Sequence, residues 1–479
     1  MNTIIDPALL KLLLLALYTA SALTAASHAL LHKRDSRSAW GWIATCWLFP
    51  LAGAFLYYLF GINRLHTRAR LLMGPSRPLG IAVGDSISKL MSAVAGVDTV
   101  ELRELVRIGG AMTGLPLSFG NRIETLHNGD EAYPAMLQAI ADARQTIYLC
   151  TYIFEAGEVG NRFIQALAAA HARGVKVRVL LDGIPDMFFA GKARRRLRAH
   201  GVPVARFLPP SLFPLMLSVN LRNHRKLLIV DSRTAFTGGM NIRDCHMLKP
   251  LTAKSTADLH FRITGPVIEQ LEHSFQDDWR FAAGEVLPPS EPAPANGDSV
   301  CRVITNGPNE DVDELVMILM GALAIAQKRV LIATPYFIPS PLLIAALQSA
   351  ALRGVQVHIL LPARSNQRYV DWASRKFLEQ LLHRRVHIWL RPPPFAHTKL
   401  FLVDGYYAQI GSANMDQRSL RLNFELVVEV YDQALVEKLA RHHDEVRATS
   451  TPLRLEDLAA RSLAGRLRDG ICWLFSPYL

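Results

Sequence analysis

Cysteine is scarce in this sequence of 479 residues, which contains five scattered along the chain. Their number is odd, and none belongs to a CxxC pair or to a Cys/His spacing typical of a metal site. We therefore expect no disulfide framework and no structural metal. The five are Cys46, Cys150, Cys245, Cys301 and Cys472.

Negative charge is also in short supply. The chain has 41 acidic residues against 53 lysines and arginines, which gives a formal net charge of +12. A basic balance of this size attracts either nucleic acid or anionic lipid. The basic run 192–198 is equally well explained as a solvated face or as a contribution to lipid attraction.

Two long uncharged runs lie near the N-terminus, at about 12–31 and 39–60. Each is long enough to cross a hydrocarbon core of about 30 Å. A cleaved signal peptide is the alternative for the first, but the closely following second run favours a transmembrane hairpin over 1–70. Equal numbers of basic residues leave the orientation undecided. They are Lys33, Arg34 and Arg37 in the loop, and Arg64, Arg68 and Arg70 after the second run.

A histidine–lysine block occurs twice in the chain. Each copy has the form His-x-Lys-x-x-x-x-Asp and is followed by a small-residue pair and an Asn, and each residue of the second copy lies 173 positions after its counterpart. Two copies in register indicate a duplicated site. The copies are His224, Lys226, Asp231, Gly238 and Asn241, and His397, Lys399, Asp404, Gly411 and Asn414.

The two blocks suit phosphoryl chemistry. On a β-strand, His and Lys two positions apart point to the same face, and the apolar runs 227–230 and 400–403 carry each strand into a core. An imidazole can attack phosphorus or move a proton, while an ammonium neutralises phosphate oxygens. The same alternation points Asp231 and Asp404 away from the site, which favours a structural role for them.

The paired blocks resemble the HKD signatures of the phospholipase D superfamily, in which the His, Lys and Asp of each block, including Asp231 and Asp404, form the catalytic signature. Nearly the whole chain, with the NLRNHRK string at 220–226 and FSPYL at 475–479, resembles bacterial cardiolipin synthases. This resemblance implies an α/β fold of two similar halves with pseudo-twofold symmetry, preceded by the hairpin. It also implies a multi-pass protein of the bacterial inner membrane whose catalytic part faces the cytoplasm.

Repeated strand–helix–strand patterns support two halves. The pattern spans 146–182 in the first half and recurs over 329–362 in the second. We expect a parallel-rich mixed sheet flanked by helices in each. The predicted organisation is a hairpin at 1–70, a connecting segment at 71–120, half 1 at 121–287, a linker at 288–297, half 2 at 298–450 and an amphipathic tail at 451–479.

The resemblance also implies roles for individual residues. His224 is expected to be the nucleophile that forms a phosphohistidine, and His397 the acid and then the base. Asp258 and Glu425 are the candidate orienting acids, because each imidazole needs a carboxylate to fix its tautomer. Asn241, Asn414 and Ser412 are expected to bind phosphate. No cofactor and no divalent metal is implied.

The implied reaction transfers a phosphatidyl group from one phosphatidylglycerol to another, giving cardiolipin and glycerol. The motif does not choose the acceptor, so water would make a phospholipase D and other alcohols another phosphatidyltransferase. A non-catalytic scaffold that binds anionic lipid is an alternative of a different class. The apolar spans make nucleic acid an unexpected partner, and the sequence does not indicate the oligomeric state.

Three further segments carry apolar residues that are either buried or membrane-facing. Met187–Phe189 and Leu208–Leu217 would meet the interface if they were exposed. The tail 461–479 mixes arginines with large apolar residues, as an interfacial helix does, although packing onto the catalytic part explains it equally well.

Overall fold

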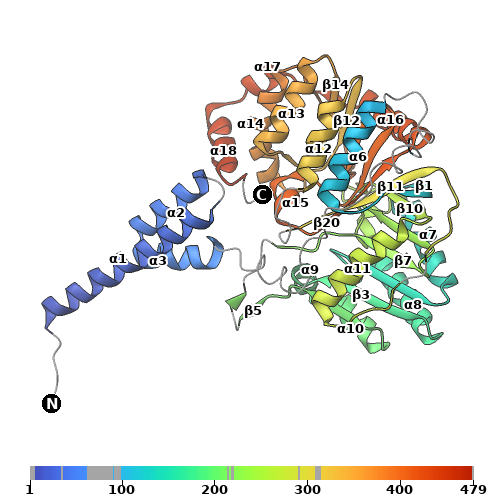
Figure 1. Cartoon of the computed structure of the whole chain (residues 1–479), viewed down its shortest axis with the longest axis horizontal. Helices are drawn as coiled ribbons and strands as arrows, with labels where there is room; N and C mark the ends of the chain where they lie inside the picture. Colours follow the sequence, from blue (N-terminus) through green and yellow to red (C-terminus); the bar gives the residue numbers. More distant parts are fainter. Residues whose placement is uncertain are drawn as a thin grey trace. The chain divides into compact units, whose positions relative to one another are not determined.

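In this computed structural model, the described part of the chain comprises residues 6–33, 36–61, 90, 99–212, 215–216, 221–289, 292–307 and 314–476. It divides into an N-terminal unit, Met1–Leu72, and a sheet unit, Met73–Leu479 (Figure 1). Several predicted features lie outside the described residues. These are Arg34, Arg64, Arg68 and Arg70, positions 71–89 and 91–98, residues 213–214 and 217–220, positions 290–291, and residues 477–479.

The N-terminal unit begins with α1 (Pro7–His32), whose first turn is capped by the Asp6 carboxylate accepting from Ala8 N. Among the described residues, α1 is the one helix long and apolar enough to cross a membrane. The second predicted run is not one continuous helix. It is divided into α2 (Ser36–Leu48), α3 (Pro50–Leu56) and the π-helical turn η1 (Tyr57–Gly61), because proline lacks the N–H that would continue the helix.

The sheet unit contains one sheet of 15 strands, described from the first half to the second. The first half contributes β4 (Val204–Phe207), β3 (Lys176–Asp182), β2 (Thr146–Thr151), β7 (Leu227–Val230), β8 (Thr234–Gly238), β10 (Leu259–Thr264) and β1 (Ser118–His127), in that spatial order. The second half continues with β11 (Ser299–Asn306), β20 (Glu425–Tyr431), β18 (Tyr407–Gly411), β17 (Leu400–Val403), β12 (Arg329–Ala333), β14 (Gln356–Pro362), β15 (His387–Arg391) and β21 (Thr451–Pro452).

The prediction of a parallel-rich sheet in each half is wrong in two respects. The halves join edge to edge through the antiparallel pair β1–β11, so they share one sheet. Among its described strands, ten neighbouring pairs are antiparallel and four are parallel. The strand–helix–strand units do give parallel pairs, but the strands after each histidine return through short hairpins, which make antiparallel neighbours.

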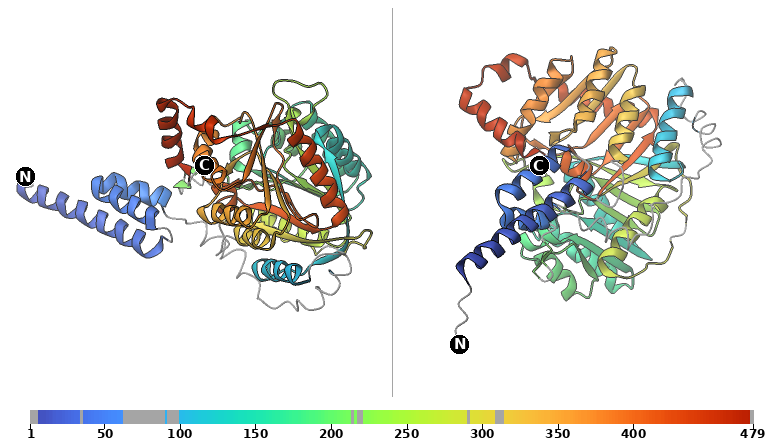
Figure 2. Two further views of the ribbon diagram at one scale, coloured as in Figure 1. Left: turned by 90° about the horizontal axis from the view of Figure 1, so that it is seen from above. Right: turned by 60° about the vertical axis from the view of Figure 1, so that its left-hand side comes forward.

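Helices cover both faces of the sheet (Figures 1 and 2). Alternation along β2 shows why: Ile147 and Leu149 join a core with the α7 and α8 side chains, whereas Tyr148 stacks on Phe275 of α11 at 5.0 Å. The first-half helices are α7 (Asn128–Asp142), α8 (Glu158–Ala172), α9 (Gly183–Phe188), α10 (Lys192–Ala199) and α11 (Ile268–Ala283). The others are α6 (Thr99–Thr113), α12 (Glu314–Ile325), α13 (Pro341–Leu352), α14 (Arg368–Leu382), α15 (Gln417–Arg421), α16 (Gln433–Ala448), α17 (Leu455–Ala459) and α18 (Leu463–Leu474).

The apolar segment around α9 is partly exposed. Met187 and Phe188 face solvent, while Phe189 is half-buried with the Arg243 guanidinium 5.7 Å from its ring. Leu208, at the start of the second apolar stretch, is buried. The two segments therefore differ in accessibility.

Candidate active site

The two histidine–lysine blocks meet at one cavity of about 210 Å³. Each histidine lies three residues before a central strand, His224 before β7 and His397 before β17. Both imidazoles line the cavity together with Asn241 and Asn414. The duplication therefore yields one composite site, to which both halves contribute.

Short backbone pairings between the halves bring His397 and Asp258 together. Strand β16 (Phe395–Ala396) pairs in parallel with β9 (Thr256–Ala257), and His397 N donates to the Ala257 carbonyl at 2.8 Å. The next residue in the first half is Asp258, whose Oδ2 lies 3.0 Å from His397 Nδ1. The orienting acid of the second histidine thus comes from the first half.

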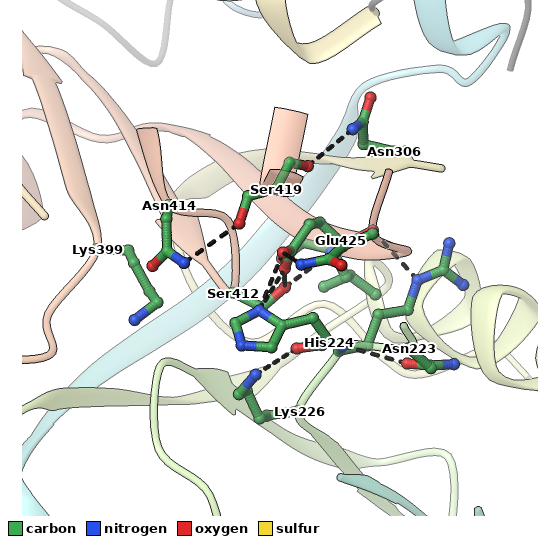
Figure 3. Close-up of polar contacts among 12 residues, drawn as sticks. Asn223, His224, Lys226, Asn306, Lys399, Ser412, Asn414, Ser419 and Glu425 are labelled. Atoms are coloured by element: carbon green, nitrogen blue, oxygen red, sulfur yellow. Dashed lines mark hydrogen bonds and ion pairs between the residues drawn. The ribbon is translucent and has the colours of Figure 1, made fainter. Parts of the chain in front are cut away.

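The other histidine has the reciprocal arrangement (Figure 3). His224 N donates to the Phe424 carbonyl at 2.9 Å, which places the adjacent Glu425 beside the ring, with Oε2 at 3.0 Å from Nδ1. Glu425 is fully buried and also accepts from Asn423 Nδ2 at 3.2 Å. A carboxylate on Nδ1 favours the tautomer that leaves Nε2 unprotonated, as a nucleophile requires.

Ser412 takes a different position from the predicted one. Its hydroxyl is fully buried, donates to Glu425 Oε2 at 2.5 Å and accepts from Leu426 N at 3.0 Å. It therefore holds the orienting acid instead of lining the cavity. The corresponding first-half residue is Gly239, where a Cβ would lie 2.6 Å from Asp258 Oδ2, so a serine does not fit there without a shift.

The two asparagines lie at the cavity wall. Asn241 Oδ1 accepts from Ile153 N at 3.1 Å, which orients the amide nitrogen away from that backbone group. Asn414 Nδ2 donates to Ser419 Oγ at 3.2 Å, and its buried Oδ1 has no hydrogen-bond partner among the described residues. Their amides are available to a ligand in the cavity.

The two lysines are buried beside their own histidines. Lys226 Nζ donates to the His224 carbonyl at 2.5 Å, and Lys399 Nζ donates to the His397 carbonyl at 2.7 Å. Within the described residues, neither ammonium forms an ion pair with a carboxylate. Buried cations are costly without a counter-charge, so this arrangement favours an anionic ligand.

Burial shapes the protonation of these four groups. It lowers the pKa of Lys226 to about 7 and that of Lys399 to about 8. Burial, with Lys226 adding to it, also lowers the pKa of His224 to about 4, and burial and the two lysines hold the pKa of His397 well below its usual value. A bound phosphate anion would raise all four values.

The lysines predict a loss of activity at alkaline pH. Each ammonium binds phosphate only when protonated, so its contribution is present below its pKa and lost above it. We expect kcat/KM to fall as pH rises through about 7 to 8. The limb in kcat should lie at higher pH, because bound phosphate raises both values. A pH–rate profile at constant ionic strength checks this, and a flat kcat/KM between about pH 6 and 9 would contradict it.

The signature aspartates lie away from the cavity, as the alternation predicts. Asp231 accepts from three successive backbone N–H groups, those of residues 144, 145 and 146, at 2.7–2.8 Å. Asp404 does the same for residues 327, 328 and 329 at 2.6–2.8 Å. Grouping these aspartates with the catalytic residues because they belong to the signature is therefore wrong in a direct sense, since they tie the turn after the histidine strand to the start of the neighbouring strand.

Asp231→Ala should accordingly reduce stability more than chemistry. Loss of the carboxylate leaves three N–H groups without their acceptor, which we expect to cost about 1–3 kcal/mol. Thermal unfolding of the detergent-solubilised protein should show a lower midpoint, while activity per folded molecule falls less than about fivefold. Unchanged unfolding with abolished activity would instead assign Asp231 to the chemistry.

Several cavity residues were not predicted as site residues. Arg222, with Asp182 3.3 Å from its guanidinium, lies in the NLRNHRK string, and the Tyr152 ring contacts the His224 ring at 4.9 Å. Arg243, Arg418 and His246 complete the basic lining. A conspicuous basic string was the available signal for Arg222, whereas a lone His246 gave none. Among the described residues, no cluster of three or more His, Cys, Asp or Glu side chains could hold a metal ion.

Comparison with known proteins places this geometry in a class. The crystal structure of phosphatidylserine synthase from Haemophilus influenzae Rd KW20 aligns with a TM-score of 0.63 at 16% identity, covering 78% of this chain and 100% of that one. A likeness at this identity shows the fold. The fold and the paired blocks together define a phospholipase D-like protein.

Sequence relatives define the family within that class. The family described as cardiolipin synthase, PLD-like domain, matches residues 136–279 and 319–447, and each stretch contains one block. Cardiolipin synthase A of Proteus mirabilis is 30% identical over 460 residues, 94% of each chain, and cardiolipin synthase A of Pseudomonas syringae pv. syringae is 33% identical over 415 residues, 85% of this chain and 86% of that one. The chain therefore belongs to the bacterial cardiolipin synthases of the phospholipase D superfamily.

The N-terminal unit has a match of its own. The family described as phospholipase D-nuclease N-terminal matches residues 20–61. Together with the apolar α1, this match indicates association with a membrane.

Proposed function

We propose that this protein transfers a phosphatidyl group from one phosphatidylglycerol to a glycerol hydroxyl of a second, giving cardiolipin and free glycerol. The observation that carries this proposal is the composite site: two imidazoles, each held by a carboxylate of the opposite half, share one cavity with two buried ammonium groups. Membership of the cardiolipin synthases supplies the lipid substrate.

In the first half-reaction, His224 Nε2 attacks the phosphorus of the donor lipid. The bond from phosphorus to the head-group glycerol oxygen breaks, and protonated His397 gives that oxygen its proton. The phosphate anion raises the pKa of His397 and so favours the protonated form. The product is a phosphatidyl group bound covalently to His224, and free glycerol.

The second half-reaction reverses the proton transfer. Neutral His397 takes the proton from a glycerol hydroxyl of the acceptor lipid, the hydroxyl oxygen attacks phosphorus, and the bond to His224 breaks. Lys226 and Lys399 neutralise the non-bridging oxygens throughout, and the Asn241 and Asn414 amides add hydrogen bonds. Glu425 and Asp258 keep the two rings oriented and stabilise their cationic forms.

The proposed architecture follows the predicted domains. Half 1 at 121–287 and half 2 at 298–450, with a linker at 288–297, are related by a pseudo-twofold axis; the identical strand order on either side of β1–β11 supports this. Residues 1–70 form a transmembrane hairpin, whose second member is the broken helix α2–α3–η1, followed by the connecting segment 71–120 and the tail 451–479. The protein is a multi-pass protein of the bacterial inner membrane with its sheet unit in the cytoplasm.

The test is incubation of the purified, detergent-solubilised protein with phosphatidylglycerol alone, in the presence of a metal chelator. We expect cardiolipin and glycerol in equal amounts, and neither from folded His224→Ala protein. Phosphatidic acid in place of cardiolipin would make the protein a phospholipase D. No product from folded wild-type protein would point to another donor or to the lipid-binding scaffold.

A further inference from the structure

The outer face of α18 carries a stripe of exposed large apolar side chains. By helix geometry these positions fall within an arc of about 120°. A stripe of this kind on a fixed surface helix needs a partner. Its members and their exposed fractions are Leu463 (71%), Leu467 (60%), Ile471 (60%), Leu474 (66%) and Phe475 (59%).

The opposite face fixes α18 to the sheet unit. The Arg468 guanidinium lies 4.0 Å from the Trp372 ring of α14, and Lys376 of α14 lies 5.1 Å from the Trp473 ring. Asp469 is buried and accepts from Arg468 at 3.0 Å and from Arg461. Figures 1 and 2 show α18 on the outside of α14. The stripe is therefore held outward by its own anchors.

Charge around the stripe identifies the kind of partner. At about 100° per residue, Arg466 and Arg468 fall at its two edges. The one acidic residue of α18 is Asp469, which is buried and neutralised by arginines. An apolar stripe with cationic edges is the pattern of helices that lie in an anionic lipid interface.

We propose that the outer face of α18 lies in the surface of a bilayer containing anionic phospholipid, as a contact separate from the N-terminal hairpin. Leu463, Leu467 and Ile471 enter the acyl boundary, while the flanking arginines meet lipid phosphates. The choice of an anionic lipid rests on the proposed function, because phosphatidylglycerol is the proposed substrate. The contact would keep the sheet unit at the surface that supplies it.

Photo-crosslinking of the full chain tests this contact. The photoreactive residue p-benzoylphenylalanine is introduced at Leu467 or Ile471, and in a matched control at Leu352, which is equally exposed (63%) but lies on α13. Each protein is placed in nanodiscs of phosphatidylcholine with or without phosphatidylglycerol, irradiated and analysed by mass spectrometry. Cardiolipin formation is measured on the same samples.

The expected result is lipid adducts at Leu467 and Ile471 at least about fivefold above Leu352, with a higher yield when phosphatidylglycerol is present. Adducts to another segment of the chain or to a second copy would overturn the proposal, as would background yield at both positions. Equal yields with and without phosphatidylglycerol would overturn the choice of an anionic surface. Cardiolipin without lipid adducts would refute the contact alone, whereas adducts without cardiolipin would refute the proposed function alone.

Discussion

His224→Ala should lower cardiolipin formation by at least about 10³-fold, because the variant lacks the atom that attacks phosphorus. His397→Ala should be impaired to a similar extent with phosphatidylglycerol, since no proton reaches the departing glycerol. Steady-state rates alone therefore cannot separate the two roles. Circular dichroism and thermal unfolding of both variants establish that the fold is retained.

A donor with a good leaving group separates the roles. In phosphatidyl-p-nitrophenol the departing phenolate needs no general acid, so His397→Ala should still form the phosphohistidine and release about one equivalent of nitrophenol per site before stopping. His224→Ala should give no burst. Mass spectrometry of the peptide that contains His224 should find the phosphatidyl adduct in the first variant. A burst from His224→Ala and none from His397→Ala would reverse the assignment.

The duplicated block was the part of the site that the sequence predicted best. Alternation and spacing are local properties, so they located both histidines, both lysines and both asparagines, and they directed Asp231 and Asp404 away from the cavity. The family resemblance added the carboxylates. Strand–helix–strand patterns likewise predicted the parallel pairs of each half.

Features that depend on contacts between distant segments were not predictable in the same way. Glu425 is 201 residues from His224, and Asp258 is 139 residues from His397, so nothing in their spacing reveals which pairs meet. Ser412 looked like a phosphate ligand because it follows the block, yet its hydroxyl is committed to Glu425. The edge-to-edge joining through β1 and β11 is another such long-range contact.

The crossed carboxylates give the second large prediction. Glu425→Gln and Asp258→Asn keep the size of each side chain but remove the charge that orients and stabilises an imidazolium. Each variant should lose about 10²–10⁴-fold in cardiolipin formation, by analogy with the acid of hydrolase triads. Unfolding measurements show whether the amide is tolerated at these buried positions.

Burst kinetics with phosphatidyl-p-nitrophenol then reveal which histidine each carboxylate serves. If Glu425 acts on the nucleophile His224, Glu425→Gln should slow the burst itself. If Asp258 acts on His397, Asp258→Asn should leave the burst fast and slow the later turnover by acceptor lipid. Pairing within each half predicts the opposite result for both variants, because Glu425 would then serve His397. The two burst rates thus test whether the halves of the sheet unit exchange their catalytic acids in solution as their backbone pairings indicate.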